Sequence, residues 1–428
     1  MQPSVGYWQS FVEYAELTDV GLRRANNQDS MATMLAGSEA DFFRRGHLFL
    51  VADGMGRHAA GELASKIAAD TVPLQYFKQP QVPPPLALRQ ALEEGNRRIF
   101  ERGKQNPDFA GMGTTTCVLV LLPQGALVGH VGDSRIYRLR RNHLEQLTFD
   151  HSVVWEMQAA AKSNNVQPPA NIPKNYITRS LGHDAAVKVD LEGPFPLESG
   201  DTFLLCSDGL SGQVEDDEIA AILACVEPTE AAQTLIDLAN LRGGPDNITV
   251  IVARVRDAAR VQDAVPPAAG GSLLGRVSMP VWVAVGASLL LSSFAFMASQ
   301  AALGTAAAGA AIVALVVAGW QILASGSPGK WKPRALGRGP HTRTELRLGE
   351  AELDKFRGIV TKLRESAAHQ SWTVDFDKGD RLLAEAAVLR KSGDAAGTLR
   401  NYCRTLSHLM RQIRKQRRDV GREPVLDD

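Results

Sequence analysis

Three aspartates at the ends of apolar runs are the residues of this chain best suited to chemistry. Asp53 ends the run Leu48 to Ala52 and is followed by Gly54. Asp208 ends the run of FLLCSDG, and Asp246 begins DNITVIVARV. The runs have the length and composition of β-strands, although a single Asp-Gly pair is also a common hairpin turn. Three carboxylates at strand ends indicate an oxygen-ligand site for hard divalent cations such as Mg or Mn.

Such carboxylates could hold two metal ions a few ångströms apart, with water between them. Water bound in this way loses a proton readily and becomes a nucleophile at neutral pH. Phosphorus is its natural target, because the same ions neutralise phosphoryl oxygens. An arginine would hold the phosphate, and either Arg23 or Arg24 could do so, since both precede another carboxylate, Asp29, in GLRRANNQDS.

The elements that must position these residues alternate between strands and helices over residues 11–256. The strand-like runs are short and bounded by Gly, Pro, Asp or Asn, as in Val118 to Leu122. Helical periodicity appears in Ala60 to Val72 and in Leu86 to Lys104. We therefore expect a mixed, largely antiparallel sheet covered by helices. Residues 158–175 form a long loop of the kind that is usually functional or mobile.

Eight motifs of this region, taken in order, resemble the bacterial type 2C, metal-dependent protein serine/threonine phosphatases. They are GLRRANNQDS, VADGMGRHAAGE, MGTTTCVLVL, GHVGDSRIYRLR, LTFDHS, ITRSLG, LLCSDGLSG and GGPDNITVIVARV. The resemblance implies an α+β fold in which a two-sheet β-sandwich is flanked by helices, with a metal cluster at one end between the sheets. It also implies that a metal-bridging hydroxide hydrolyses phosphoserine and phosphothreonine on proteins, without a covalent phosphoenzyme.

The resemblance assigns the metal ligands residue by residue. Asp53 would bridge two Mn or Mg ions, and the carbonyl of Gly54 would bind one of them. Asp208 and Asp246 would hold the other ion. Asp133, in GDSR, would join Asp208 at a third, weaker metal position.

Two further residues receive roles from the same resemblance, and three positions depart from it. Asp29 would bind the cluster through water, and Arg24 would hold the phosphate. Gln28 replaces the commoner Glu, Met55 stands where animal members carry a histidine proposed as general acid, and Arg57 stands where glycine is usual. None of them removes a direct metal ligand. The alternative function is a pseudophosphatase or membrane scaffold that binds phosphorylated partners without turnover.

The remainder of the chain predicts a membrane anchor and a tail. Residues 257–275 are rich in Pro, Ala and Gly and indicate a linker. Within residues 276–326, two uncharged runs, Met279 to Ala298 and Ala302 to Ala324, have the length of transmembrane helices; a buried hairpin is the alternative. Basic residues on the outer flanks predict two spans in the bacterial inner membrane, with the catalytic domain and the tail in the cytoplasm.

Residues 327–343 form a basic juxtamembrane segment, and residues 344–428 have the pattern of a small helical module. A basic segment beside a membrane span indicates a cytoplasmic flank, so we expect no nucleic acid as a partner. The expected partners are phosphorylated protein substrates, a cognate serine/threonine kinase and membrane lipid. Small residues in the second span would permit a homo-oligomer through the hairpin.

Overall fold

The computed structural model describes residues 8–56, 59–163, 176–258, 279–324, 335–369 and 374–420. Arg57, most of the predicted linker and most of the predicted loop 158–175 lie outside these ranges. The chain divides into two compact units, one of residues 1–264 with 333–428 and one of residues 265–332. The segment after residue 333 therefore belongs to the same unit as the predicted catalytic region.

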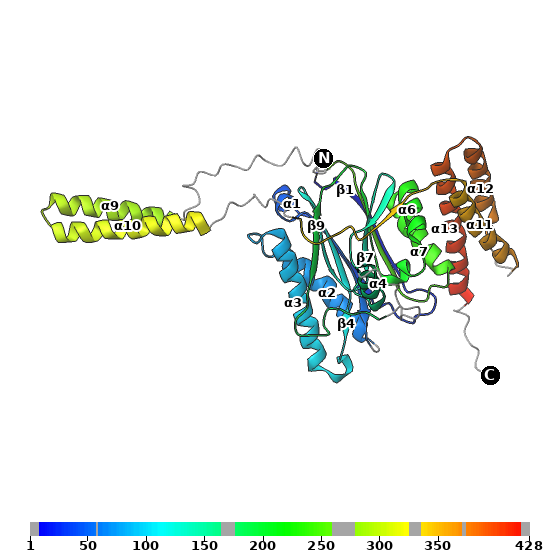
Figure 1. The fold of residues 1–428 in the computed structure, drawn as a ribbon, viewed down its shortest axis with the longest axis horizontal. Helices are drawn as coiled ribbons and strands as arrows, with labels where there is room; N and C mark the ends of the chain where they lie inside the picture. Colours follow the sequence, from blue (N-terminus) through cyan, green and yellow to red (C-terminus); the bar gives the residue numbers. More distant parts are fainter. Residues whose placement is uncertain are drawn as a thin grey trace. The chain divides into compact units, whose positions relative to one another are not determined.

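The first unit is built on two antiparallel sheets that face each other (Figure 1). The first sheet has the strand order β1-β11-β10-β7-β8-β12. Its strands are β1 (Val12–Asp19), β11 (Ile248–Val255), β10 (Thr202–Cys206), β7 (Arg135–Arg140), β8 (His143–Gln146) and β12 (Thr342–Glu345). The second sheet has the order β2-β3-β5-β6-β9, and the short β4 pairs with β3. Its strands are β2 (Asp29–Met34), β3 (His47–Met55), β5 (Thr116–Leu122), β6 (Gly125–Val131), β9 (Asp190–Phe195) and β4 (Gly113–Thr114).

Apolar side chains of each central strand alternate between two cores. Phe203 and Leu205 of β10 lie in the core between the sheets, together with Phe49 of β3. Leu204 and Cys206 of the same strand lie in a second core, on the other face of the first sheet. This alternation follows from the two-residue period of a strand and explains why β10 is apolar throughout. The predicted two-sheet sandwich is confirmed.

Helices cover the outer faces of both sheets (Figure 1). The second sheet is covered by α2 (Ala60–Phe77) and α3 (Pro84–Gln105). The first is covered by α6 (Asp216–Cys225) and α7 (Pro228–Leu241). The shorter helical elements are α1 (Glu39–Arg45), η1 (Pro107–Phe109), α4 (Val153–Ser163) and α5 (Asp208–Ser211).

The C-terminal segment packs on α6 and α7. It consists of β12 and the helices α11 (Glu350–His369), α12 (Phe376–Lys391) and α13 (Ala395–Val420). Strand β12 pairs antiparallel with β8 and so extends the first sheet by one strand. Phe356 and Leu406 are fully buried in the same core as Ile222 of α6 and Leu235 of α7. The segment and the sandwich therefore share one apolar core.

The second unit is a helical hairpin of α9 (Met279–Met297) and α10 (Ala301–Ala324). Within the described part of the chain, no helix combines the length and the apolar character needed to cross a membrane. A span needs about 20 apolar residues. The predictions of a transmembrane hairpin and of a two-span inner-membrane location are therefore wrong.

Candidate active site

The predicted metal-binding aspartates come from strands of both sheets and lie at one end of the sandwich. Asp29 begins β2 and stands opposite Asp53 in the register with β3. Asp208 follows β10, and Asp246 precedes β11. Because Cys206 pairs with Val250, the end of β10 and the start of β11 meet at the same edge of the first sheet. Antiparallel pairing thus brings together residues that are far apart in the sequence.

The carboxyl groups shift one another's pKa values, as like charges in a shared site do. Burial raises the pKa of Asp29 to about 7, and the charges of Asp208 and Asp246 add to this effect. Burial also raises the pKa of Asp133 to about 7, with Asp208 as the largest charge contribution. The pKa of Asp53 lies well above its usual value because the group is buried and then because Asp29, Asp208 and Asp133 are near. Like charges at this density favour binding of cations.

The carboxylates also have oxygens that no protein group satisfies. Among the described residues, Oδ1 of Asp29 and Oδ1 of Asp133 are buried without a hydrogen-bond partner. The other oxygen of Asp29 accepts a hydrogen bond from the hydroxyl of Ser207, at 2.8 Å. A buried carboxylate oxygen without a partner is costly, and a hard cation is the ligand such an oxygen prefers. The residues present therefore fit divalent metal ions.

Arg24 lies at the rim of this cluster. Its Nη2 is 2.7 Å from Oδ2 of Asp246, and its side chain is 50% exposed. The hydrogen bond to Asp246 raises the pKa of the guanidinium, and the charges of Asp53 and Asp208 act in the same direction. A half-exposed arginine beside a carboxylate cluster is placed to meet an anionic ligand that arrives from solvent. The structure thus brings all the predicted site residues to one end of the sandwich.

The backbone around Asp53 is held in place by threonines of the neighbouring strands. The Asp53 amide donates to Oγ1 of Thr115 at 3.0 Å, and the hydroxyl of Thr114 donates to the Asp53 carbonyl at 2.8 Å. A Cβ on Gly54 would lie 2.1 Å from the Gly61 carbonyl oxygen. Only glycine fits at that position, so the Asp-Gly pair reflects close packing of the backbone.

Sequence reasoning missed two residues that support the site. Ser207 bonds Asp29 and also accepts from the Thr249 amide, at 3.0 Å. Asn247 accepts from the Gln28 amide at 2.8 Å and donates to two carbonyls of the loop between β1 and β2, those of Val20 and Asn26. Ser207 directly precedes Asp208 in the motif SDG, and Asn247 directly follows Asp246 in the motif PDN. This position next to a predicted metal ligand is the sequence feature that could have identified them.

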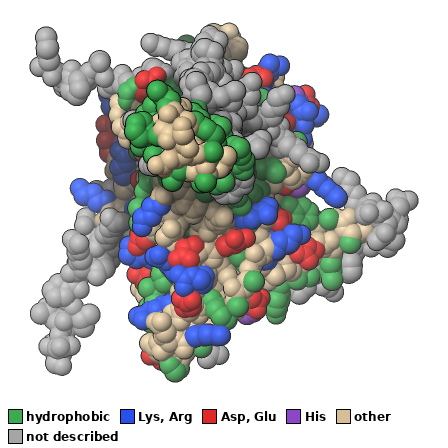
Figure 2. Space-filling model, turned by 90° about the vertical axis from the view of Figure 1, so that its left-hand side faces the viewer, with side chains coloured by type: hydrophobic (Ala, Val, Ile, Leu, Met, Phe, Trp, Pro, Cys, Tyr) green, Lys and Arg blue, Asp and Glu red, His purple; other side chains and the backbone are tan. Residues whose placement is uncertain are grey.

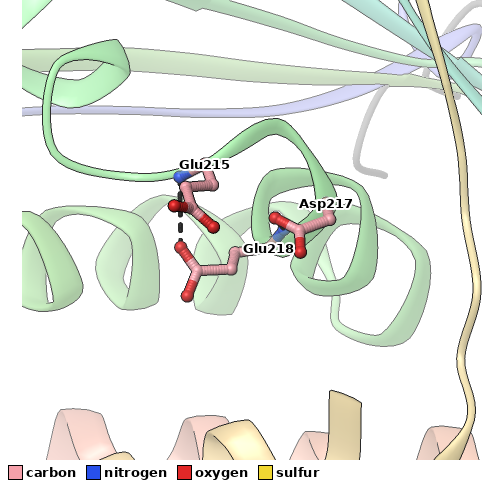
Figure 3. Close-up of side chains that lie close together, drawn as sticks. All are labelled: Glu215, Asp217 and Glu218. Atoms are coloured by element: carbon pink, nitrogen blue, oxygen red, sulfur yellow. Dashed lines mark hydrogen bonds between the residues drawn. The ribbon is translucent and has the colours of Figure 1, made fainter. Parts of the chain in front are cut away.

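A second acidic group lies outside this site. Glu215, Asp217 and Glu218, at the start of α6, are the described residues whose ligand atoms all lie within 4.8 Å of one another (Figure 3). Nζ of Lys355 is 3.1 to 3.2 Å from a carboxylate oxygen of each of them. Arg242 also pairs with Glu218. These two cations offset most of the charge of the three acids, so the group joins α11 to α6 as an ion-pair network.

A two-sheet sandwich with carboxylates gathered at one end is the architecture of a metal-dependent phosphatase. Residues 23–238 match the family model described as protein phosphatase 2C. The protein phosphatase PhpP of Streptococcus pneumoniae serotype 2 is 36% identical over 252 residues, which cover 58% of this chain and 98% of PhpP. The serine/threonine phosphatase stp of Listeria monocytogenes is 34% identical over 244 residues, covering 55% of this chain and 92% of stp.

A solved structure matches the same region. It is the catalytic domain of the serine/threonine protein phosphatase PstP in complex with two manganese ions, 36% identical, covering 57% of this chain and 99% of that one with a TM-score of 0.47. The chain belongs to the protein phosphatase 2C family. Its activity is that of a protein serine/threonine phosphatase, as predicted, and the pseudophosphatase alternative is not favoured.

Proposed function

We propose that the aspartate cluster is the catalytic centre and that it works with Mn or Mg. Asp53, Asp208 and Asp246 would hold two ions with the carbonyl of Gly54, and Asp133 would serve a third, weaker position. Asp29 would act through water. Residues 11–256 would form the catalytic domain, and the match of residues 23–238 to the family model supports this extent.

One observation carries the proposal: Asp29 is buried without a cation. Among the described residues, the acids with the least exposed surface are Asp29, Glu145, Asp150, Glu192, Asp201, Glu218 and Asp237. All except Asp29 have a basic side chain within 4 Å. The pairs are Glu145 with Arg138, Asp150 with Arg135, Glu192 with His341, Asp201 with Arg140, Glu218 with Arg242, and Asp237 with Arg414. Buried carboxylates are normally paired or bind metals. Asp29, which stands opposite Asp53, is the exception that a metal cluster explains.

The protein's own residues would prepare the substrate for hydrolysis. When bound, divalent cations lower the pKa of water and neutralise phosphoryl oxygens. Arg24 would hold and orient the phosphoryl group of phosphoserine or phosphothreonine at the rim of the cluster. Thr114 and Thr115 fix the backbone of Asp53, and Ser207 fixes the carboxylate of Asp29. Rigid positioning of this kind lowers the reorganisation needed during the reaction.

Replacing a proposed ligand tests the site. Asp53→Asn and Asp208→Asn should each lower hydrolysis of a phosphothreonine peptide with Mn²⁺ at least about 100-fold, while circular dichroism stays native. Excess EDTA should abolish wild-type activity. Glu215→Gln is the matched control, because it removes an acid from the other cluster and should leave activity intact. Full activity of either Asp variant would contradict the proposal.

Two partner proposals remain. A cognate serine/threonine kinase would supply the phosphorylated proteins on which this enzyme acts. A second copy of the chain could pair with the hairpin, because apolar side chains such as Leu290, Phe294 and Val316 are exposed on it. Hydrophobic side chains, in green, are prominent on the hairpin in Figure 2. Sedimentation of the full chain and of a chain without residues 279–324 would test self-association. Equal masses per chain for both would contradict it.

A further inference from the structure

The C-terminal segment contacts the catalytic domain at two acids, Asp19 and Asp237. Asp19 ends β1, and Asp237 lies on α7. Nη1 of Arg414, on α13, is 2.9 Å from Oδ2 of Asp19, and its Nη2 is 2.6 Å from Oδ1 of Asp237. The side chain of Asp237 is only 1% exposed. Arg414 is thus a cation placed between two carboxylates, and without it those carboxylates would repel each other.

Asp19 in turn holds the loop that leads to Arg24. Its Oδ1 accepts from the Gly21 amide at 2.9 Å and from Nδ2 of Asn240 at 3.1 Å. The next amide, that of Leu22, donates to the Gly244 carbonyl at 2.8 Å. These bonds join the loop after β1 to the loop after α7.

The two loops approach each other as closely as backbone can. Gly21 has a φ of +79°, and a Cβ there would lie 2.2 Å from the Asp246 carbonyl oxygen. The first loop carries Arg24 and the second carries Asp246, and these two side chains form the ion pair at the rim of the site. A shift of either loop therefore moves the proposed phosphate-binding group relative to a proposed metal ligand.

We propose that Arg414 is a positioning residue: through Asp19 and Asp237 it fixes the loops of Arg24 and Asp246, so that the C-terminal segment sets phosphate affinity at the active site. This inference rests on the proposed function of those two residues. PhpP matches over 98% of its own length but only 58% of this chain, so much of this chain has no counterpart in that relative. The coupling would therefore be a property added to the catalytic domain by the segment after residue 333.

The test compares Arg414→Gln with Arg404→Gln in the full chain. Arg404 is also on α13 and joins the segment to α7, through Glu230 at 2.9 Å, but it does not contact Asp19. With saturating Mn²⁺, Arg414→Gln should raise KM for a phosphothreonine peptide about 5-fold or more, with kcat within about twofold of wild type. The inhibition constant of inorganic phosphate should rise in parallel. Arg404→Gln should leave both constants unchanged, and Arg414→Lys should restore part of the loss.

Hydrogen exchange gives a readout that does not depend on activity. The amides of Gly21 and Leu22 should exchange faster in Arg414→Gln than in Arg404→Gln, because their acceptors are no longer held in place. If Arg414→Gln does not fold, the triple variant Asp19→Asn, Asp237→Asn and Arg414→Gln removes all three charges together and should show the same rise in KM. An active wild type with equal KM and equal exchange in the Arg414 and Arg404 variants would overturn the inference. A wild type without activity would instead count against the proposed function.

Discussion

Replacing Leu406 by alanine asks whether the C-terminal segment and the sandwich unfold as one body. Leu406 is fully buried on α13, in a core that also contains Ile222 of α6 and Leu235 of α7. The substitution removes three carbon atoms from the boundary between the segment and the catalytic domain. Leucine-to-alanine changes in such cores cost 2 to 5 kcal/mol, so we expect a loss of about 3 kcal/mol in the free energy of unfolding.

Urea unfolding followed by circular dichroism and by p-nitrophenyl phosphate hydrolysis measures this loss. With an m-value of about 3 kcal/mol/M, both midpoints should fall by about 1 M. Val388→Ala is the control, since Val388 lies on α12 with 67% of its surface exposed. That change should cost less than about 0.5 kcal/mol.

The two probes separate a shared core from an independent module. If the core is shared, activity and circular dichroism shift together, because loss of the segment exposes α6 and α7. If the dichroism midpoint falls and the activity midpoint stays, the segment unfolds by itself. That outcome would refute the reasoning from the common core.

Two further predictions follow from single groups. Burial raises the pKa of Asp237 to about 6 from an unfolded value near 3.8, so its stabilising contribution is fully present below pH 3.8 and is lost as pH rises through 6. The difference in unfolding free energy between wild type and Asp237→Asn should therefore change by at most about 3 kcal/mol between pH 4 and pH 7, to the disadvantage of wild type at pH 7. A pH-independent difference would contradict this assignment. Gly54→Ala should lose most activity and about 1 to 3 kcal/mol of stability, because a Cβ there meets backbone oxygens of Gly61 and Gln28 that cannot move away. Gly37→Ala, where a Cβ meets nothing within 4 Å, is the control, and equal activity of the two variants would show that the close approach at Gly54 is unimportant.

Most of the candidate active site could be predicted from short local sequence patterns. An apolar run that ends in Asp-Gly indicates where a strand ends. Antiparallel pairing then limits which strand ends can lie at the same edge of a sheet. Asp53, Asp208 and Asp246 could be placed together on that basis, with the family resemblance fixing the order. The support from Ser207 and Asn247 could not be predicted, because the hydrogen bond from Ser207 to Asp29 spans 178 positions and the one between Asn247 and Gln28 spans 219.

The C-terminal segment shows a different limit. The apolar face of α13 predicts that Leu406 is buried, but periodicity does not say against what, and here the partner is the catalytic domain. The helical hairpin of α9 and α10 shows a third limit of prediction from sequence. Hydropathy counted along the chain predicted two membrane spans, whereas the described residues contain no helix suited to that role.

The distribution of buried charge links the site to the rest of the fold. Asp150 pairs with Arg135 at 2.7 Å, and Asp237 pairs with Arg414 at 2.6 Å. Each of these two buried carboxylates is therefore paired with an arginine. At Asp29 the fold supplies a serine hydroxyl and leaves one oxygen without a partner. Leaving a buried carboxylate in that state costs free energy, and binding of a cation at the cluster would recover it. We therefore expect Mn²⁺ to raise the thermal unfolding temperature of wild type, and to raise that of Asp53→Asn much less; equal shifts would mean that the ion binds elsewhere.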